Sequence, residues 1–350
     1  MNESASQRRH DRIIALWLFA CCALVFAMVV LGGVTRLTGS GLSMVEWDPI
    51  FGIVPPLSQE AWQTVFEKYQ ASPEYKKKNF GMDLDGFKEI YWFEYAHRVL
   101  GRTIGSAFLL PFLFFLWRGW IRRPLVPKLV AMFVLGGLQG LLGWYMVKSG
   151  LVDDPHVSQY RLTAHLLLAF LIYGFILWVA LDLWRGDRVA PHPRWRPAAT
   201  LTALTFVTIG SGGLVAGLKA GHAYNTFPLM DGRLVPEVWL MLEPAWRNFF
   251  ENIATVQFDH RLLAITTLTL TLLFAWRAAT DASLPAASRR ALLLWGGMAI
   301  VQVMLGIGTL LLHVPIALAS SHQAGALVLL TLALNAVHRL RRPAPAHSAG

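Results

Sequence analysis

The sequence predicts an all-α integral membrane protein with eight transmembrane helices, arranged as two tandem four-helix bundles. Three observations predict this class. First, 55% of the 350 residues are hydrophobic, only 15% are charged, and the mean hydropathy is +0.46, which is too apolar for a soluble protein of this length. Second, eight segments have the roughly 20 mostly apolar residues that a membrane span requires. Third, the second half of the chain repeats the motifs of the first.

The predicted spans cover residues 13–34, 97–117, 125–146, 162–183, 198–218, 260–277, 292–312 and 316–338. More than half of the 31 basic residues lie in the two tails and in alternate connections: Arg8, Arg9, Arg12, Arg118, Arg122, Arg123, Lys128, Arg185, Arg188, Arg194, Arg196, Arg277, Arg289, Arg290, Arg339, Arg341 and Arg342. The positive-inside rule puts these segments in the cytoplasm, including the tails 1–12 and 341–350. The net charge of +10 is therefore a topology signal, and we expect no nucleic-acid partner.

Five motifs recur in the same order in the two halves. GGVTRLTGSGL (32–42) matches GGLVAGLKAG (212–221), VPPLSQEAW (54–62) matches LVPEVW (234–239), FEYAHRVLGR (93–102) matches QFDHRLLAI (257–265), LQGLLGWYMV (138–147) matches VQVMLGIGTLL (301–311), and RLTAHLLLA (161–169) matches ASSHQAGAL (319–327). Each half, 13–190 and 191–340, has an even number of spans. The sequence therefore predicts halves related by a pseudo-twofold axis along the membrane normal.

The first connection outside the predicted cytoplasmic side, about residues 35–96, contains an amphipathic stretch, LSQEAWQTVFEKYQ (57–70). Trp62, Val65 and Phe66 have helical spacing in it. This pattern predicts a helix that lies at the membrane surface, that serves as a lid, or both.

Four of the eleven histidines occupy matching places in the repeat, at the predicted outer starts of the second, fourth, sixth and eighth spans. They are His97, His165, His260 and His322. The other seven, in tails, loops or at a span end, are expected to be solvated or capping residues: His10, His156, His192, His222, His313, His338 and His347. Ionisable groups at membrane depth are costly and usually functional. Although one such histidine could be an interfacial anchor, four at equivalent positions indicate shared ligands.

The pairing of these histidines favours heme. Zinc normally takes three or four ligands, whereas two imidazoles from facing helices suit the two axial positions of a heme. We expect one heme between the second and fourth spans and another between the sixth and eighth, side by side near the outer face. Arg98, Arg102 and Arg261 could pair with heme propionates or, alternatively, with lipid headgroups.

Glu94 and Gln257 distinguish the two halves, because each stands three residues before its histidine. Residues i and i+3 share a helix face, so Glu94 should point toward the cofactor that His97 ligates. A carboxylate there can accept a proton or stabilise positive charge, whereas an amide only forms hydrogen bonds. The first half then becomes a reaction site and the second an electron-transfer site. The alternative is that Glu94 forms a cap or a salt bridge with Arg98.

Over residues 13–340 the chain resembles the heme A synthase family. The resemblance rests on GGVTRLTGSGLSM (from residue 32), EYAHR (94–98), TAH (163–165), FDHR (258–261) and SSHQ (320–323). It implies an enzyme of a bacterial cytoplasmic membrane that oxidises a porphyrin methyl group of heme O to the formyl group of heme A, for cytochrome oxidase. One departure is the absence of cysteine between residues 35 and 96, where some bacterial members carry a pair.

The resemblance also implies roles for the residues. His260 and His322 would hold a permanent heme b, His97 and His165 would flank the substrate heme O, and Glu94 would be the catalytic carboxylate. Either an N-terminal histidine leaves the iron or the chemistry occurs at the porphyrin edge. The partners that this resemblance suggests are heme O as substrate, an external electron donor, membrane lipids, heme O synthase and further copies of the chain.

Two competing interpretations remain. A diheme b-type electron-transfer cytochrome would use the same histidines but has no evident need for the difference between Glu94 and Gln257. A transporter could also contain tandem repeats, but the sequence lacks midplane charges and broken helices in paired positions.

Overall fold

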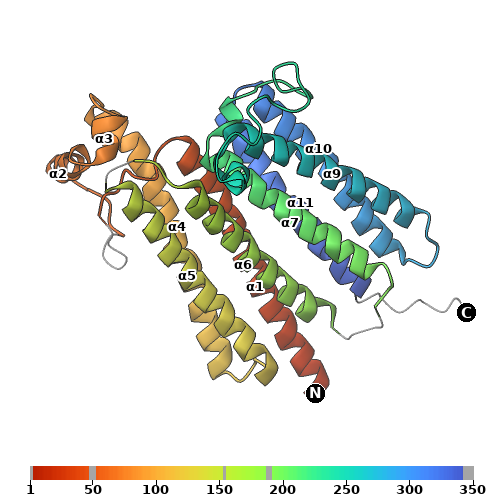
Figure 1. The fold of residues 1–350 in the computed structure, drawn as a ribbon. Coiled ribbons are helices and arrows are strands. Elements are labelled where there is room, and N and C mark those ends of the chain that lie inside the picture. Colours follow the sequence, from red (N-terminus) through yellow and green to blue (C-terminus); the bar gives the residue numbers. More distant parts are fainter. Residues whose placement is uncertain (1–2, 47–52, 153–154, 187–190, 342–350) are drawn as a thin grey trace, which may run out of the picture.

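The computed structural model describes residues 3–46, 53–152, 155–186 and 191–341, which form a bundle of long helices (Figure 1). Eight of the helices are long and apolar enough to cross a membrane, which confirms the predicted number: α1 (Glu3–Leu37), α4 (Leu84–Trp117), α5 (Val126–Gly150), α6 (Gln159–Arg185), α7 (Trp195–Gly217), α9 (Ile253–Ala279), α10 (Ala286–Leu311) and α11 (Ile316–Arg341). The short helices are α2 (Gln59–Gln70), α3 (Pro73–Lys77) and α8 (Asn248–Glu251), with 3-10 turns η1 (Arg123–Leu125), η2 (Ala220–His222) and η3 (Ala245–Arg247).

Two of the long helices begin earlier than the apolar pattern predicted. Asp83 caps α4 by accepting a hydrogen bond from Gly86 N at 2.9 Å, so His97 lies about 20 Å along that helix. Asn252 caps α9 in the same way, and His260 lies about 10 Å along it. The prediction that these histidines stand at the very starts of their helices was therefore wrong. Polar residues before each histidine lower the hydropathy of the first turns without ending the helix.

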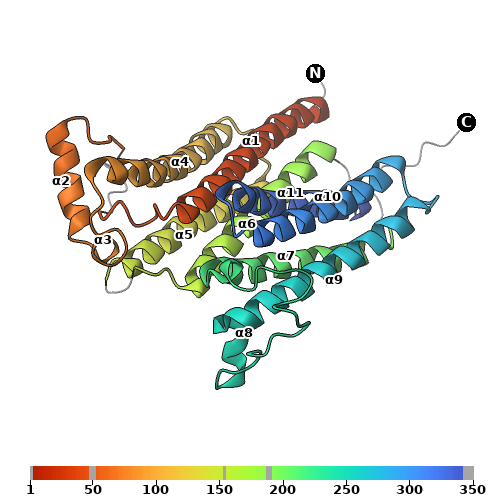
Figure 2. The ribbon, with the colours of Figure 1, turned by 90° about the horizontal axis from the view of Figure 1, so that it is seen from above.

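The long helices form two sets of four with matching contacts. In the first set α1 contacts α4, α4 contacts α5, α5 contacts α6, and α6 contacts α1. In the second set α7, α9, α10 and α11 contact one another in the same cyclic order. Between the sets, α1 contacts α11, α7 contacts α6, and α6 contacts α11. Seen from above (Figure 2), the first set lies on one side and the second on the other.

The hydrophobic core follows the same division. One cluster of buried side chains includes Leu18 of α1, Phe112 of α4 and Phe170 of α6. A second cluster includes Trp295 of α10 and Leu340 of α11, both fully buried. Helix α11 contributes to both clusters, so it lies at the seam between the two sets.

Pairs of glycines allow the two sets to approach closely. A methyl group added at Gly33 of α1 would lie 2.9 Å from the Gln323 side chain of α11, and one at Gly213 of α7 would lie 3.0 Å from Thr163 Oγ1 of α6. Gln323 Nε2 also donates a hydrogen bond to Val29 O of α1 at 2.7 Å. The first helix of each set is thus held against the fourth helix of the other.

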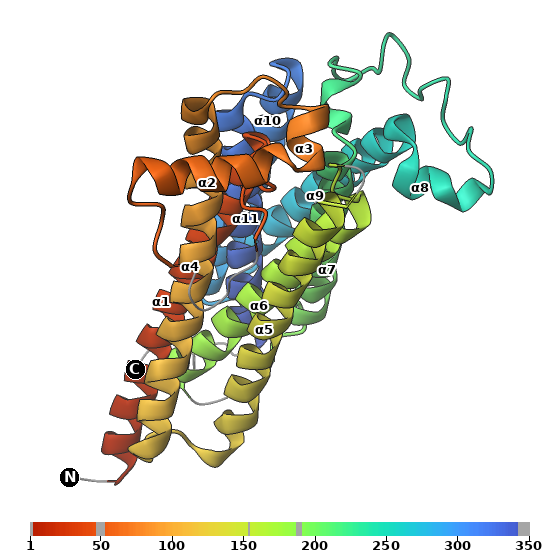
Figure 3. The ribbon, with the colours of Figure 1, turned by 90° about the vertical axis from the view of Figure 1, so that its left-hand side faces the viewer.

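The predicted amphipathic helix over residues 57–70 is present as α2, and it is not a free surface helix. Its buried face, Trp62, Phe66 and Tyr69, packs on Phe87 and Tyr91 in the first turns of α4. Trp62 meets the Tyr91 ring edge-on, with centroids 5.0 Å apart. Figure 3 shows α2 and α3 lying across the end of the bundle that also carries α8. We call this the long-loop end.

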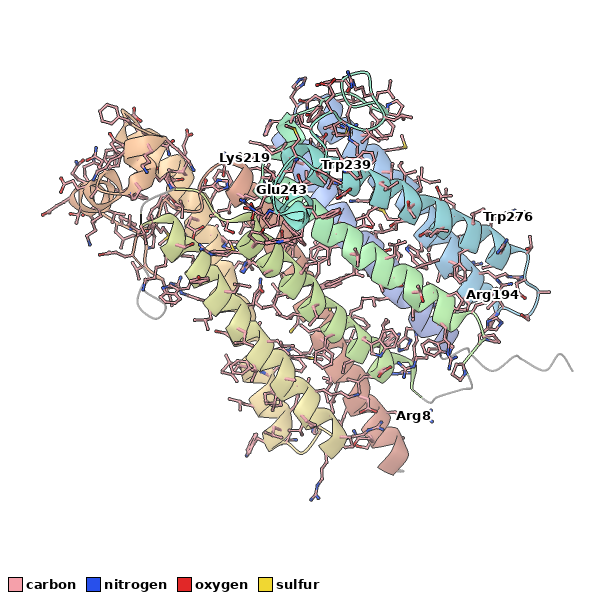
Figure 4. All side chains as sticks on the ribbon, in the orientation of Figure 1. Arg8, Arg194, Lys219, Trp239, Glu243 and Trp276 are labelled. Carbon is pink, nitrogen blue, oxygen red and sulfur yellow. The ribbon has the colours of Figure 1, made fainter. Side chains whose placement is uncertain are left out.

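Charged residues are distributed unevenly between the two ends of the bundle. Figure 4 places Arg8 and Arg194 at the end opposite Lys219, which lies at the long-loop end. Asp11 of α1 forms an ion pair with Arg122, and Asp281 pairs with Arg194 at 2.6 Å. These few acidic residues partly neutralise the basic segments of the end where α1 begins and α11 ends.

His338 departs from its predicted solvated position, because it is fully buried in α11. Its Nδ1 lies 2.7 Å from Arg185 Nη1, and its Nε2 lies 2.9 Å from Asp182 Oδ1. A guanidinium can only donate, so Nδ1 accepts, and the ring proton sits on Nε2 and is donated to Asp182. The ring therefore joins α6 to α11 across the seam.

Candidate functional site

Each of the four predicted ligand histidines packs its ring against a glycine of a neighbouring long helix. The pairs are His97 with Gly32, His165 with Gly143, His260 with Gly212, and His322 with Gly306. A methyl group added at any of these glycines would lie 2.9 to 3.1 Å from a ring atom, closer than carbon atoms normally pack. The glycines therefore provide the space that the rings occupy.

His260 and His322 come together at one cavity. It measures about 270 Å³, lies among α7, α9, α10 and α11, and is lined by both rings. The two imidazoles are near enough to interact electrostatically. His222, which the sequence assigned to a solvated loop, also lines this cavity. The pairing predicted for the second half is thus present in the fold.

Both rings of this C-terminal pair are held by hydrogen bonds at Nδ1. Ser211 Oγ lies 2.8 Å from His260 Nδ1. Gln302 Nε2 lies 3.1 Å from His322 Nδ1 and donates to His322 O at 2.9 Å. Hydrogen bonds to the second ring nitrogen are the usual means by which proteins orient a ligating histidine.

His97 and His165 form the corresponding N-terminal pair, on α4 and α6, and also lie close enough to interact electrostatically. Gln139 Nε2 of α5 donates to His165 O at 3.0 Å. Within the described ranges, however, neither ring has a hydrogen bond at a ring nitrogen, and His165 Nδ1 is buried without a partner. The two pairs therefore share their glycines but differ in how the rings are held.

Glu94 and Gln257 are both buried, with 4% and 3% of their surface exposed. Glu94 Oε1 accepts a hydrogen bond from Arg98 Nε at 2.7 Å, so the salt bridge considered as an alternative is formed. Gln257 Oε1 accepts from Arg261 Nη2 at 2.9 Å, and its Nε2 donates to Ala220 O at 2.8 Å. The same position thus holds a buried carboxylate in one half and a fully bonded amide in the other.

Arg98 and Arg261 also fix the loops of the long-loop end. Arg98 donates to Glu46 O at 2.7 Å and to Met44 O at 2.8 Å. Arg261 donates to Tyr224 O at 2.7 Å and to Thr226 O at 2.8 Å. Backbone carbonyl groups thus already accept hydrogen bonds from most of the N–H groups of these two arginines. Heme propionates, the predicted partners, would have to compete with these carbonyl groups.

Several cationic groups near the two sites keep donors that no loop carbonyl group of the described residues accepts, or lie within reach of the cavity. Arg261 Nε is buried without a hydrogen-bond partner among the described residues. Arg102, the third predicted arginine, lies half-buried on α4, one turn beyond Arg98. Two further cations line the C-terminal cavity, Lys219 and Arg36, and Arg36 reaches it from α1 with a hydrogen bond to Ala216 O at 3.3 Å.

Sequence reasoning did not identify Ser211, Gln139, Gln302 or Arg36 as site residues. The signal for the two glutamines was present in the repeat, because each stands four residues before the glycine that faces a histidine. Arg36 gave no such signal, since it belongs to the first half and lines the cavity of the second.

The residues around His260 and His322 fit a heme. The pair offers two imidazoles from facing helices, an apolar cavity and nearby cations, which are the elements that a bis-histidine heme requires. Within the described ranges no group of three His, Cys, Asp or Glu side chains is arranged to hold a metal ion, so two axial ligands on a planar cofactor remain the better fit.

Comparison with known proteins agrees with this chemistry. Residues 15–334 match the COX15-CtaA family of cytochrome oxidase assembly proteins. The chain is 58% identical over 334 residues to heme A synthase of Nitrosospira multiformis, covering 94% of each chain, and 55% identical over 327 residues to that of Nitrosomonas eutropha, covering 92% of each. It is 49% identical over 346 residues to heme A synthase COX15 of Arabidopsis thaliana, covering 95% of this chain and 75% of that protein. The chain therefore belongs to the COX15-CtaA family of cytochrome oxidase assembly proteins.

Proposed function

We propose that this protein is a heme A synthase, a membrane enzyme that oxidises one methyl group of heme O to the formyl group of heme A for cytochrome oxidase. The observation that carries the proposal is the difference between Glu94 and Gln257, two buried residues at the same place beside two similar pairs of histidines. The relatives that bear the name of this enzyme span nearly the whole chain. A pure electron carrier has no need for a carboxylate in only one half.

We assign the two halves different tasks. In the C-terminal half, 191–340, His260 and His322 hold a resident heme b, which supplies a one-electron redox centre. In the N-terminal half, 13–190, His97 and His165 hold heme O as the substrate. The matching contacts of the two sets of helices and the four histidine–glycine pairs support the assignment and the pseudo-twofold relation between the halves.

Glu94 is the proposed catalytic residue. Converting a methyl to a formyl group is a four-electron oxidation in two steps through an alcohol. With dioxygen as the oxidant, each step takes up two electrons from the external donor and two protons and releases one oxygen atom of dioxygen as water. A carboxylate on the helix face of His97 can accept protons and stabilise positive charge that develops at the methyl carbon. Arg98 Nε, 2.7 Å away, donates a hydrogen bond to that carboxylate and orients it.

Arg98 and Arg261 have a second task in this proposal. Each joins the helix of a ligand histidine to the loop that covers its site, at residues 44–46 and 224–229 respectively. Arg102, Lys219 and Arg36 are the cations that we assign to anionic propionates, with the buried Arg261 Nε as a further donor.

We place the protein in the bacterial cytoplasmic membrane as a multi-pass protein with both termini in the cytoplasm. Arg8 and Arg194, which belong to the basic tails and connections, both lie at the end of the bundle opposite the long-loop end (Figure 4), and the positive-inside rule puts such segments in the cytoplasm. The heme sites then face the outer side. This position leaves the long-loop end for an external electron donor and for delivery of heme O by heme O synthase.

The proposal is tested by extracting hemes from membranes that co-express heme O synthase and comparing the wild type with Glu94→Gln and Glu94→Ala. Glu94→Gln places in the first half the amide that the second half already carries, so folding should be retained. We expect the wild type to make heme A and both variants to accumulate heme O or its alcohol, with heme A reduced at least about 100-fold. Equal heme A in all three would remove Glu94 from catalysis. Heme b alone in every sample would favour the electron-transfer cytochrome.

A further inference from the structure

One difference between the two histidine pairs lies outside the Glu94 and Gln257 positions. The glycines that face His97 and His260, Gly32 and Gly212, are preceded on their helices by Leu31 and Ser211. These two residues hold the same place in the repeat, directly before the GG pair, but only one of them has a hydroxyl group.

Ser211 determines which nitrogen of His260 carries the proton. Its hydroxyl group has one proton and donates it to Thr208 O at 2.8 Å, one turn earlier in α7. The oxygen must therefore accept at its other short contact, 2.8 Å from His260 Nδ1. The proton lies on Nδ1, so the lone pair of Nε2 is available to an iron, and rotation of the ring would break the hydrogen bond.

His97 has no equivalent support. Leu31 offers no acceptor, and within the described part of the chain no hydrogen bond reaches either ring nitrogen of His97. Gly32 permits the ring to approach α1, since a methyl group added there would lie 3.1 Å from Nε2, but contact with a glycine gives no directional restraint.

The other histidine of each pair is contacted by a glutamine, and it too is held at its ring only in the C-terminal half: Gln302 Nε2 lies 3.1 Å from His322 Nδ1, whereas His165 Nδ1 is buried without a partner among the described residues. Gln139 and Gln302, on α5 and α10, both donate to the backbone carbonyl group of their histidine, at 3.0 Å and 2.9 Å. The side-chain oxygens of both glutamines are buried without a partner among the described residues. The Ser211 contact at His260 is therefore one of two contacts at Nδ1 that the C-terminal pair has and the N-terminal pair lacks.

We propose that Ser211 is a positioning residue that makes His260 a permanent axial ligand, and that Leu31 in the same place leaves His97 free to leave the iron, so that the N-terminal site can exchange its porphyrin. This inference rests on the proposed function. It attributes the difference in ligand lability between His260 and His97 to one hydroxyl group.

The test measures ligand lability, not turnover. Purified protein loaded with heme b and heme O is reduced with dithionite and exposed to carbon monoxide, which binds only where a histidine leaves the iron. In parallel, excess apomyoglobin captures released heme, and chromatography counts heme b and heme O separately. In the wild type we expect the carbon monoxide-binding fraction to equal the heme O fraction.

The substitutions act in opposite directions. Ser211→Ala should make heme b reactive to carbon monoxide and speed its transfer to apomyoglobin by about 10- to 100-fold, the usual effect of removing such a partner. Ser211→Thr keeps the hydroxyl group and should restore slow release. Ser320→Ala, which removes a buried hydroxyl group without a partner in the described ranges, is the matched control. Leu31→Ser should slow both carbon monoxide binding and release of heme O, whereas Leu31→Ala should not.

Each outcome decides the inference. If Ser211→Ala holds heme b like Ser320→Ala, or if Leu31→Ser releases heme O like Leu31→Ala, the hydroxyl group does not set ligand lability and the inference is wrong. If the wild type binds no heme b, the proposed function fails as well. If heme b is bound and heme A is made while these variants show no contrast, the proposed function stands and only this inference is lost.

Discussion

Replacing Gly306 with alanine tests whether the glycines provide space for the ligand rings. The added methyl group would lie 2.9 Å from His322 Cε1 and 3.5 Å from Nε2, so the ring must move. Overpacking typically costs about 1–3 kcal/mol. Because the ring must stay on the iron in the heme-bound form, this cost falls on that form and should weaken heme b binding by about 5- to 150-fold.

Gly297 of the same helix gives a matched control, because a methyl group there meets nothing within 4 Å. Gly297→Ala should retain heme b and raise the thermal unfolding midpoint in detergent. The assay is the ratio of heme b to protein after size-exclusion chromatography, followed by the rate of heme transfer to apomyoglobin. If Gly306→Ala retains heme b as well as Gly297→Ala does, the ring does not need this glycine and the packing argument fails.

Two further predictions concern stability. Burial raises the pKa of Glu74, in the long-loop end, to about 7, above its unfolded value of 4.5. The folded state therefore binds the proton more tightly, and this contribution to stability is fully present below about pH 4.5 and is lost as the pH rises through about 7. Glu74→Gln should therefore flatten the pH dependence of the unfolding midpoint between about pH 5 and 8, and an unchanged slope would contradict the assignment. His338→Ala should destabilise the protein by about 2 kcal/mol, because it removes a fully buried ring and leaves the half-buried Asp182 and Arg185 without their shared partner. His313→Ala, at an exposed position, should change the midpoint little, and equal midpoints for the two variants would contradict the role of His338.

The number of helices and the pairing of the histidines could be predicted because both leave a periodic record in the sequence. A span needs a long apolar run, and a duplicated unit repeats its functional residues at equal spacing. The start of α4 could not be found in this way. Its first turns carry the charged residues Asp85, Lys88 and Glu89, and they are stabilised by packing against α2. A search for long apolar segments does not detect a helical turn that is stabilised in this way.

The contacts within the site were less predictable. That His322 faces Gly306 depends on how two helices are rotated, although the matching positions of Gly143 and Gly306 carried a signal. The bonds from Arg98 and Arg261 to loop carbonyl groups depend on irregular segments for which the sequence has no period. His338 was placed in solvent because it stands near the end of the chain, whereas α11 continues to Arg341.

The hydrogen bond from Gln323 to Val29 has a consequence for how the protein is made. It joins the last membrane helix to the first, next to a histidine of each half. During synthesis α1 enters the membrane long before α11. The face of α1 that carries Gly33 therefore lacks its α11 partner until nearly the whole chain is inserted. The N-terminal half therefore reaches its final packing only after α11 is inserted, and the C-terminal histidine pair is completed at the same moment, because α11 carries His322.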